Sequence, residues 1–171
     1  MRNHRIFSGV IAFSIGITLL MPPSVVNAIG WPIYGNWGGP GWSGGSNGNK
    51  APCDVMDAAF MRHDIKYEQV KGLWSRLSLL QRARAVALAD QELVNEVSAI
   101  NPETLRVTSK CKDLPKSKGV RNDTINYFRP KAKQNQEVAR MIQTGECKDA
   151  VVSLYGNSAC IRKTIVLGKR R

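Results

Sequence analysis

The stretch that decides the fold lies at positions 52–71 and reads PCDVMDAAFMRHDIKYEQVK. Its apolar residues recur mostly at intervals of three and four, the spacing of a helix with one buried face. Pro52 suits the first turn of such a helix, and Asp54 or Asp57 is the candidate N-cap. Lys71-Gly72 ends the pattern, so we predict an amphipathic helix over this stretch.

A second helix is predicted at about Ser75–Ala99, because leucine and valine recur there at intervals of three and four residues. Asn101-Pro102 ends it. Helices joined by a short turn usually lie antiparallel with their apolar faces together, and we expect that arrangement here. A third helix is predicted at Pro130–Thr144, with Gly145 as its cap. The sequence therefore predicts a mainly α fold.

The segments outside these helices are predicted as largely irregular structure. Residues 29–50 are rich in glycine and include Trp31, Trp37 and Trp42. No helix survives that density of glycine, and the tryptophans indicate a loop that makes contacts rather than a flexible linker. Between the second and third helices the chain turns basic, and we predict a loop there. Its basic residues are Lys110, Lys112, Lys116, Lys118 and Arg121. A short β-type run is predicted at Thr164–Leu167.

The first segment of the chain has the pattern of a secretory signal peptide. Basic residues precede an apolar run at Ile6–Met21, and Ala28 offers a small residue for cleavage. The alternative is a transmembrane anchor, but the run is shorter than the roughly 20 residues that span a bilayer. We predict a signal peptide at residues 1–28. Residues 29–171 then form a single domain, secreted or periplasmic, with a basic C-terminal region.

Four cysteines remain in that domain, namely Cys53, Cys111, Cys147 and Cys160. An exported chain matures under oxidising conditions, so these cysteines are expected to form two disulfides. Of the three possible connectivities, the short loop favours Cys147 with Cys160, which leaves Cys53 with Cys111. Zinc binding is the alternative, but no two of the cysteines stand at close ligand spacing.

The composition is that of a folded and strongly basic chain. The 171 residues include 25 Lys and Arg against 13 Asp and Glu, for a net charge of +12, and 43% of them are hydrophobic. That apolar content excludes an intrinsically disordered protein. The positive charge favours an anionic partner, which could be nucleic acid, an acidic lipid surface or an acidic protein. Charge alone does not choose among the three.

The first helix carries a candidate acid–base site. His63 and Tyr67 are four residues apart and share a face, while Asp64 points in a neighbouring direction. On the second helix Asp90 interrupts the apolar stripe, and antiparallel packing would bring it to His63. A carboxylate on an apolar seam needs a partner, and this pair would leave one ring nitrogen free to take a proton from water. The alternative is a structural core histidine with an ordinary surface acid.

A calcium site is feasible beside this pair. Calcium takes about six to eight hard oxygen ligands, and a glycine-rich loop can turn several main-chain carbonyls toward one point. Asp64 would supply a carboxylate from the helix. The alternative for Asp64 is a solvated position on the helix surface.

Taken together, the glycine-rich loop, the helix with His63-Asp64 and Tyr67, and Asp90 on the next helix resemble the secreted phospholipase A2 family over about residues 34–97. The stretches closest to its parvovirus capsid type are Asp57-Ala58-Ala59 and Ala89-Asp90-Gln91. The resemblance implies two long antiparallel, disulfide-supported helices preceded by a glycine-rich calcium loop. It implies His63 as general base, Asp90 as its supporting acid and Tyr67 as a network partner. The calcium ligands that it implies are Trp37, Gly39 and Gly41 through their main-chain oxygens and Asp64 through its carboxylate.

The activity implied by this resemblance is calcium-dependent hydrolysis of the sn-2 ester of glycerophospholipids, by water that His63 activates. The partner would then be a phospholipid membrane surface, and anionic lipid would suit the basic charge of the chain. Two alternatives remain open. One is a catalytically inactive phospholipase-like protein that binds membranes or proteins. The other is a secreted basic nuclease, which only the charge and the presence of His and Asp suggest.

Overall fold

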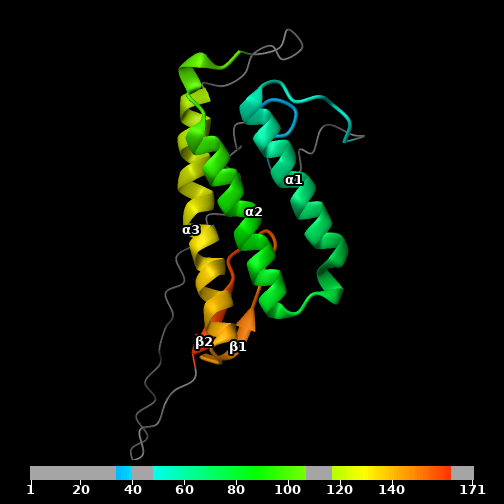
Figure 1. Cartoon of the computed structure of the whole chain (residues 1–171), viewed down its shortest axis with the longest axis vertical. Helices are drawn as coiled ribbons and strands as arrows, with labels where there is room; N and C mark the ends of the chain where they lie inside the picture. The colour runs from blue at the N-terminus through cyan, green and yellow to red at the C-terminus, as the bar shows by residue number, and fades with distance from the viewer. Residues whose placement is uncertain (1–33, 40–47, 107–116, 163–171) are drawn as a thin grey trace, which may run out of the picture.

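The computed structural model describes residues 34–39, 48–106 and 117–162. These residues are mainly helical, which confirms the predicted fold class. The helices are α1 (Val55–Leu73), α2 (Leu79–Ala99) and α3 (Ser117–Gln143), with the short 3-10 helices η1 (Trp74–Arg76) and η2 (Pro102–Thr104). The strands β1 (Cys147–Val151) and β2 (Ala159–Arg162) form an antiparallel hairpin. Figure 1 shows α2 between α1 and α3, with the hairpin at the end of the bundle where α3 finishes.

The N-cap of α1 is Asp54, and Asp57 has a different role. The Asp54 carboxylate accepts hydrogen bonds from the amides of Met56 and Asp57, at 2.9 Å each, which satisfies two of the orphan donors of the first turn. The helix continues to Leu73, two residues past the predicted stop at Lys71. The first helix is therefore close to the sequence prediction.

The second helix begins at Leu79, so its predicted start at Ser75 is wrong by four residues. Ser78 and Gln81 form a capping box, in which each side chain accepts a hydrogen bond from the other residue's amide. This cap is a stronger helix start than Ser75, and residues 74–76 form a 3-10 turn instead. Ion pairs from α1 to α2 join Arg62 to Glu96 and Lys66 to Glu92, which fixes the two helices as antiparallel.

The third helix differs most from the sequence prediction. It begins at Ser117 rather than at Pro130, so Lys118 and Arg121 lie in a helix and not in a loop. Pro130 lies inside α3, where a proline usually costs about 3 kcal/mol. Buried residues continue on one helical face on both sides of it, and this burial outweighs the local penalty. The buried side chains on that face are Val120, Thr124, Lys131, Asn135 and Val138.

The guanidinium of Arg121 joins the start of α3 to the end of α2. It donates hydrogen bonds to the carbonyls of Val97, Ser98 and Ile100, at 3.1, 2.6 and 3.0 Å. The last carbonyls of a helix have no partner within the helix, and a cation is favoured there by the helix dipole. This contact sets the antiparallel register of α3 against α2.

The β1–β2 hairpin was missed by the sequence analysis. The disulfide between Cys147 and Cys160 joins its two strands, as predicted. Cys53 is also disulfide-bonded, and no described cysteine is free, which leaves zinc without a thiolate among these residues. The predicted partner of Cys53, Cys111, lies outside the described residues, as does the β-type run at Thr164–Leu167.

The core begins at the glycine-rich loop. Tyr34 and Trp37 are buried against side chains from all three helices, so this part of the loop packs as its tryptophan indicated. The helical members of that core are Met56, Ala59, Phe60, Leu93, Val97, Val120 and Ile125. The predicted signal peptide, Trp31, Gly41 and Trp42 lie outside the described residues. None of the described helices combines the length and apolar character needed to cross a lipid bilayer.

Candidate active site

The contact expected between α1 and α2 is present in the middle of the bundle. The ring Nε2 of His63 lies 3.0 Å from Oδ1 of Asp90. His63 is 8% exposed and Asp90 is fully buried. An ionised carboxylate only accepts hydrogen bonds, so Nε2 is the protonated nitrogen and Nδ1 carries the lone pair. The imidazole is thus oriented as a base whose second nitrogen is held by an acid.

Tyr67 completes this contact one turn further along α1. Its hydroxyl donates to the same oxygen of Asp90 at 2.5 Å, and its ring lies 4.3 Å from the His63 ring, centroid to centroid. Burial and the charge of Asp90 raise the pKa of the Tyr67 hydroxyl, which therefore remains a protonated donor. All three residues predicted for acid–base chemistry are in mutual contact.

The surroundings of His63 act on its pKa in opposite directions. Burial lowers the pKa of the imidazole, whereas hydrogen bonding and the charges of Asp64 and Asp90 raise it, and the net direction is upward. The ring of Phe128, from α3, packs edge-on against the imidazole with centroids 4.9 Å apart. This packing fixes the plane of the imidazole ring, and the two carboxylates favour its protonated form.

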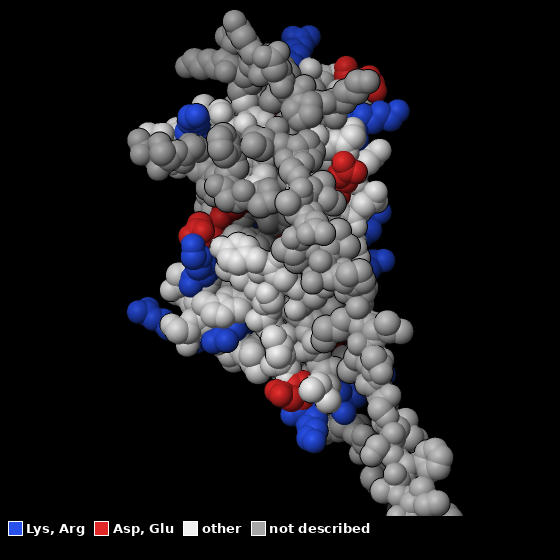
Figure 2. Space-filling model, turned by 180° about the vertical axis from the view of Figure 1, so that it is seen from behind, with Lys and Arg blue, Asp and Glu red and all other residues white. Residues whose placement is uncertain are grey.

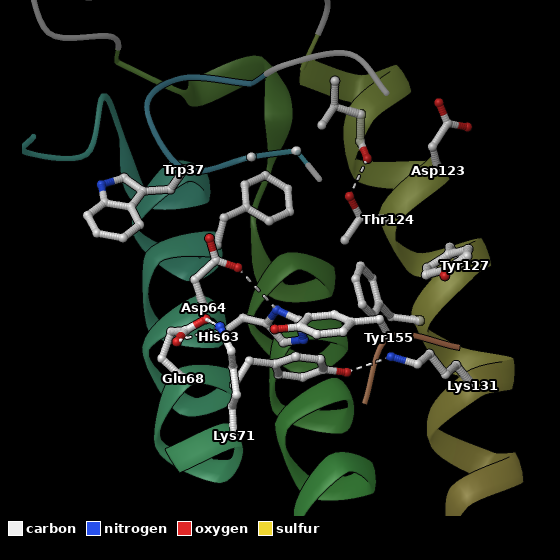
Figure 3. A pocket seen from close by; sticks show the side chains of 16 residues that line it. Trp37, His63, Asp64, Glu68, Lys71, Asp123, Thr124, Tyr127, Lys131 and Tyr155 are labelled. Carbon is white, nitrogen blue, oxygen red and sulfur yellow. Dashed lines mark hydrogen bonds and ion pairs between the residues drawn. The ribbon is translucent and has the colours of Figure 1, made fainter. Parts of the chain in front are cut away.

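Lys131 is a further member of this network, and the sequence analysis did not single it out. This α3 side chain is only 6% exposed, and its ammonium donates to the Tyr67 hydroxyl at 2.6 Å and to the Leu154 carbonyl at 3.1 Å. It also lies 3.4 Å from Oδ2 of Asp90. Figure 3 shows the lysine reaching from α3 toward the tyrosine hydroxyl. Arg129 and Lys133 are basic neighbours of similar sequence character, so the one signal that could have distinguished Lys131 was its place on the buried face of a longer helix.

Asp64 lies on the open side of His63. Its side chain is 25% exposed, and one carboxylate oxygen lies 3.7 Å from Nδ1 of His63. Trp37, Gly38 and Gly39 of the glycine-rich loop line the same pocket as these two side chains (Figure 3). Three of the four residues predicted to bind calcium therefore line one pocket, and the fourth, Gly41, lies outside the described residues.

The loop is attached to α1 by the carboxylate of Asp57, a second residue whose role the sequence analysis missed. Oδ2 of Asp57 accepts hydrogen bonds from the amides of Asn36 and Cys53, at 2.9 and 2.8 Å, and Oδ1 accepts one from the amide of Trp37 at 2.9 Å. Asp57 is fully buried. Its acidity near the helix start suggested only a cap, whereas the carboxylate ties the loop to the helix that carries His63.

Glycine is required at the tight turn of this loop. Tyr34 and Gly38 exchange two main-chain hydrogen bonds, at 2.7 and 2.9 Å. Gly35 has a φ of 65°, and a Cβ there would lie only 2.3–2.6 Å from the Asp57 carboxylate. The close approach of carboxylate and backbone is thus possible only without a side chain.

The chemistry of the donor set fits calcium. Calcium prefers hard oxygen ligands, and a carboxylate together with main-chain oxygens is a common combination. Among the described residues, no three His, Cys, Asp or Glu side chains come together as a metal site. Of the residues expected to bind calcium, Asp64 carries a carboxylate, and Trp37 and Gly39 have only main-chain oxygens to offer.

The pocket in front of His63 has a volume of about 520 Å³. Its walls come from α1, α3, the glycine-rich loop and the segment between β1 and β2 (Figure 3). The lining combines apolar and aromatic side chains with polar and charged ones, as sites for organic ligands do. The polar and charged members are His63, Asp64, Glu68, Lys71, Asp123, Thr124 and Lys131. The apolar and aromatic members are Trp37, Phe60, Tyr67, Val120, Tyr127, Phe128 and Tyr155.

Comparison of the chain with family models, with curated proteins and with solved structures finds no match in any of the three.

Proposed function

We propose that this protein is a secreted or periplasmic calcium-dependent phospholipase A2, which hydrolyses the sn-2 ester of glycerophospholipids. The observation that carries the proposal is the placement of one imidazole between two carboxylates in the wall of a pocket that is partly apolar and aromatic. Asp90 holds Nε2 of His63 at 3.0 Å, and Asp64 lies beside Nδ1 with the glycine-rich loop next to it.

His63 supplies the base. With Nε2 protonated toward Asp90, Nδ1 accepts a proton from a water molecule in the pocket, and the water oxygen attacks the ester carbonyl carbon. Asp90 then faces an imidazolium and stabilises its charge. When the bond to the glycerol oxygen breaks, the same proton passes from Nδ1 to that oxygen. The products are a free fatty acid and a lysophospholipid, and no covalent enzyme intermediate is formed.

Asp64 and main-chain oxygens of the loop would hold the metal. Calcium bound there would polarise the ester carbonyl and offset the negative charge that develops on its oxygen. Asp57 contributes by holding the loop amides of Asn36 and Trp37 against α1. The loop and the base are thus attached to the same helix.

The remaining surface suits a lipid substrate. The apolar part of the pocket lining matches an acyl chain, and the net charge, +12 for the full chain and +10 without Arg2 and Arg5 of the predicted signal peptide, favours an anionic membrane. Each basic residue near such a membrane contributes about 1 kcal/mol. In Figure 2, basic and acidic side chains alternate around the edges of the face shown. The long-range attraction therefore comes from the overall excess of basic residues.

The test is fatty acid release from vesicles of mixed phosphatidylglycerol and phosphatidylcholine, with calcium and with a chelator. His63→Gln should lose activity by roughly 10²- to 10⁴-fold, the range for removal of a general base. Asp64→Asn should lose activity and calcium binding together. Asp149→Asn, the same chemical change at an exposed site on the hairpin, is the matched control and should behave as wild type.

Two results would reject the proposal. Wild-type protein that binds the vesicles without releasing fatty acid, at any calcium concentration, would indicate a non-catalytic membrane binder. Undiminished hydrolysis by His63→Gln would remove the assigned base. Cleavage of nucleic acid with a steep dependence on salt would instead support the nuclease alternative.

A further inference from the structure

Lys131 brings a positive charge into the interior of the bundle, beside the buried acid. A buried ammonium is unfavourable unless it is paired and hydrogen-bonded. All of its polar contacts are made with Asp90, with Tyr67 and with the main chain of the segment after β1. Its ammonium also lies 5.0 Å from the Tyr67 ring centroid and 5.7 Å from that of Phe128, both within the range of a cation–π contact.

The buried negative charge of Asp90 needs a cation beside it. One oxygen of the carboxylate accepts from His63 and Tyr67, which are both neutral donors while the imidazole is a base. The other oxygen has no hydrogen-bond partner among the described residues and lies 3.4 Å from the ammonium of Lys131. Lys131 is therefore the group that balances the negative charge of the acid in the resting state.

The same ammonium also fixes the direction of the Tyr67 hydroxyl. Because Lys131 donates to the hydroxyl oxygen at 2.6 Å, the hydroxyl hydrogen is left to point at Asp90. Burial lowers the pKa of Lys131 and the charge of Asp90 raises it in part, as expected for an ammonium held by a buried acid. The chain of contacts runs from Lys131 through Tyr67 to Asp90 and ends at His63.

We propose that Lys131 is a positioning residue for the general base, which acts through Tyr67 and Asp90 to hold Nε2–H of His63 toward the acid. This inference rests on the proposed function for its kinetic meaning, but its structural content is independent of it. The supporting groups come from three elements: Lys131 from α3, Tyr67 from α1 and the Leu154 carbonyl from the segment between β1 and β2.

The first experiment compares Lys131→Met with Lys133→Met. Lys133 is an exposed lysine on the same helix, so it controls for the loss of one positive charge. We expect Lys131→Met to lower kcat on the order of tenfold to a hundredfold with KM little changed, since it removes a charge-assisted hydrogen bond within the network. Lys133→Met should keep the wild-type kcat. In a Tyr67→Phe background the loss from Lys131→Met should be smaller than in wild type.

The second experiment reads the histidine directly and does not depend on activity. The chain has two histidines, and loss of the predicted signal peptide removes His4, so ¹⁵N-histidine labelling of the mature protein should give one set of ring signals, from His63. At a pH where the ring is neutral, wild type should show the Nε2–H form of His63 with a hydrogen-bonded proton signal. Lys131→Met should shift that signal or mix the two tautomers, and Lys133→Met should leave it unchanged.

A third measurement keeps the inference testable should Lys131→Met fail to fold. ¹⁵N-lysine labelling of the unmodified chain should show one ammonium group that exchanges slowly with water, and Tyr67→Phe should shift it. A protein without such a signal would overturn the inference. So would a folded Lys131→Met protein with the kcat and His63 spectrum of wild type. If wild type releases no fatty acid while the spectra behave as expected, the proposed function fails and the positioning contact stands.

Discussion

The Asp57 carboxylate is the residue-scale feature on which the loop depends. Its two oxygens accept three main-chain amides, so every contact requires an acceptor and none requires a donor. Both oxygens of a carboxylate accept hydrogen bonds, whereas the isosteric amide has one acceptor oxygen and one donor NH₂ group. The negative charge and the shape of the side chain are therefore both used.

Asp57→Asn is expected to lower the free energy of unfolding by about 2–4 kcal/mol. In either orientation of the amide, its NH₂ group faces at least one main-chain N–H, which leaves a buried donor without an acceptor. Urea denaturation measures the change, with Asp149→Asn as the exposed control. An Asp57→Asn protein as stable as this control would contradict the assigned contacts.

Gly35, in the loop ahead of α1, and Gly72, in the last turn of α1, make a matched pair. Gly35→Ala is expected to destabilise by about 2 kcal/mol or more, because the new Cβ meets the Asp57 carboxylate and φ is positive. Gly72→Ala, where nothing lies within 4 Å of the new Cβ, should be neutral or stabilise by about 0.5–1 kcal/mol. Thermal unfolding of both variants checks the prediction, and equal effects would refute it.

At the same scale, sequence reasoning reached His63, Tyr67 and Asp90 but not Lys131. The first three follow from helical spacing on two adjacent helices and from the need of a buried acid for a partner. Lys131 contacts Tyr67 from 64 residues away. Its selection from a run of basic residues depends on the packing of α3, which no local pattern contains.

At the scale of elements, the sequence predicted α1 well, α2 with a start four residues too early, and α3 poorly. A helix cap depends on residues close in sequence, so the sequence could name Asp54 as one of two N-cap candidates for α1. The start of α3 was misplaced because Pro130 was interpreted as a helix start, although buried residues on both sides of it share one face. The β1–β2 hairpin was missed because its five- and four-residue strands have little alternation.

Pro130→Ala tests whether the proline merely destabilises α3 or gives the helix its shape. Proline inside a helix removes a main-chain hydrogen bond and crowds the preceding turn, and Pro130 is exposed. We expect the substitution to raise the free energy of unfolding by about 1–3 kcal/mol. Gln136→Ala, at another exposed position on α3, should change it by about 0.5 kcal/mol or less. A loss of stability in Pro130→Ala would show instead that the proline shapes the helix.

At the scale of the molecule, the hairpin and the candidate site form one structural unit. Ser158 donates to the Asn135 side chain at 2.5 Å, and Asn135 in turn donates to the Lys131 carbonyl at 3.0 Å. Tyr155 lines the pocket from the segment between the strands. The sequence predicted the disulfide that closes this hairpin, but not that the hairpin contacts the network behind His63.

Replacement of Cys147 and Cys160 together by serine should cost about 2–3 kcal/mol of stability, because the bond closes a segment with a sequence separation of 13. Loss of the hairpin's position should also lower fatty acid release, since Leu154 and Tyr155 belong to the site. Unfolding and vesicle hydrolysis measure the two effects. The double variant is preferable to a reductant, which would also reduce the disulfide of Cys53. Full activity in the double variant would show that the site does not depend on the position of the hairpin.

Asp57, His63, Asp64 and Tyr67 all belong to α1, within three turns of one another. Sliding of α1 past its neighbours would change the spacing between His63 and Asp90 but not the spacing between His63 and Asp64. In the proposed function, thermal motion would therefore disturb the proton acceptor before it displaced calcium. Warming should accordingly erode turnover at temperatures where cation affinity is still retained.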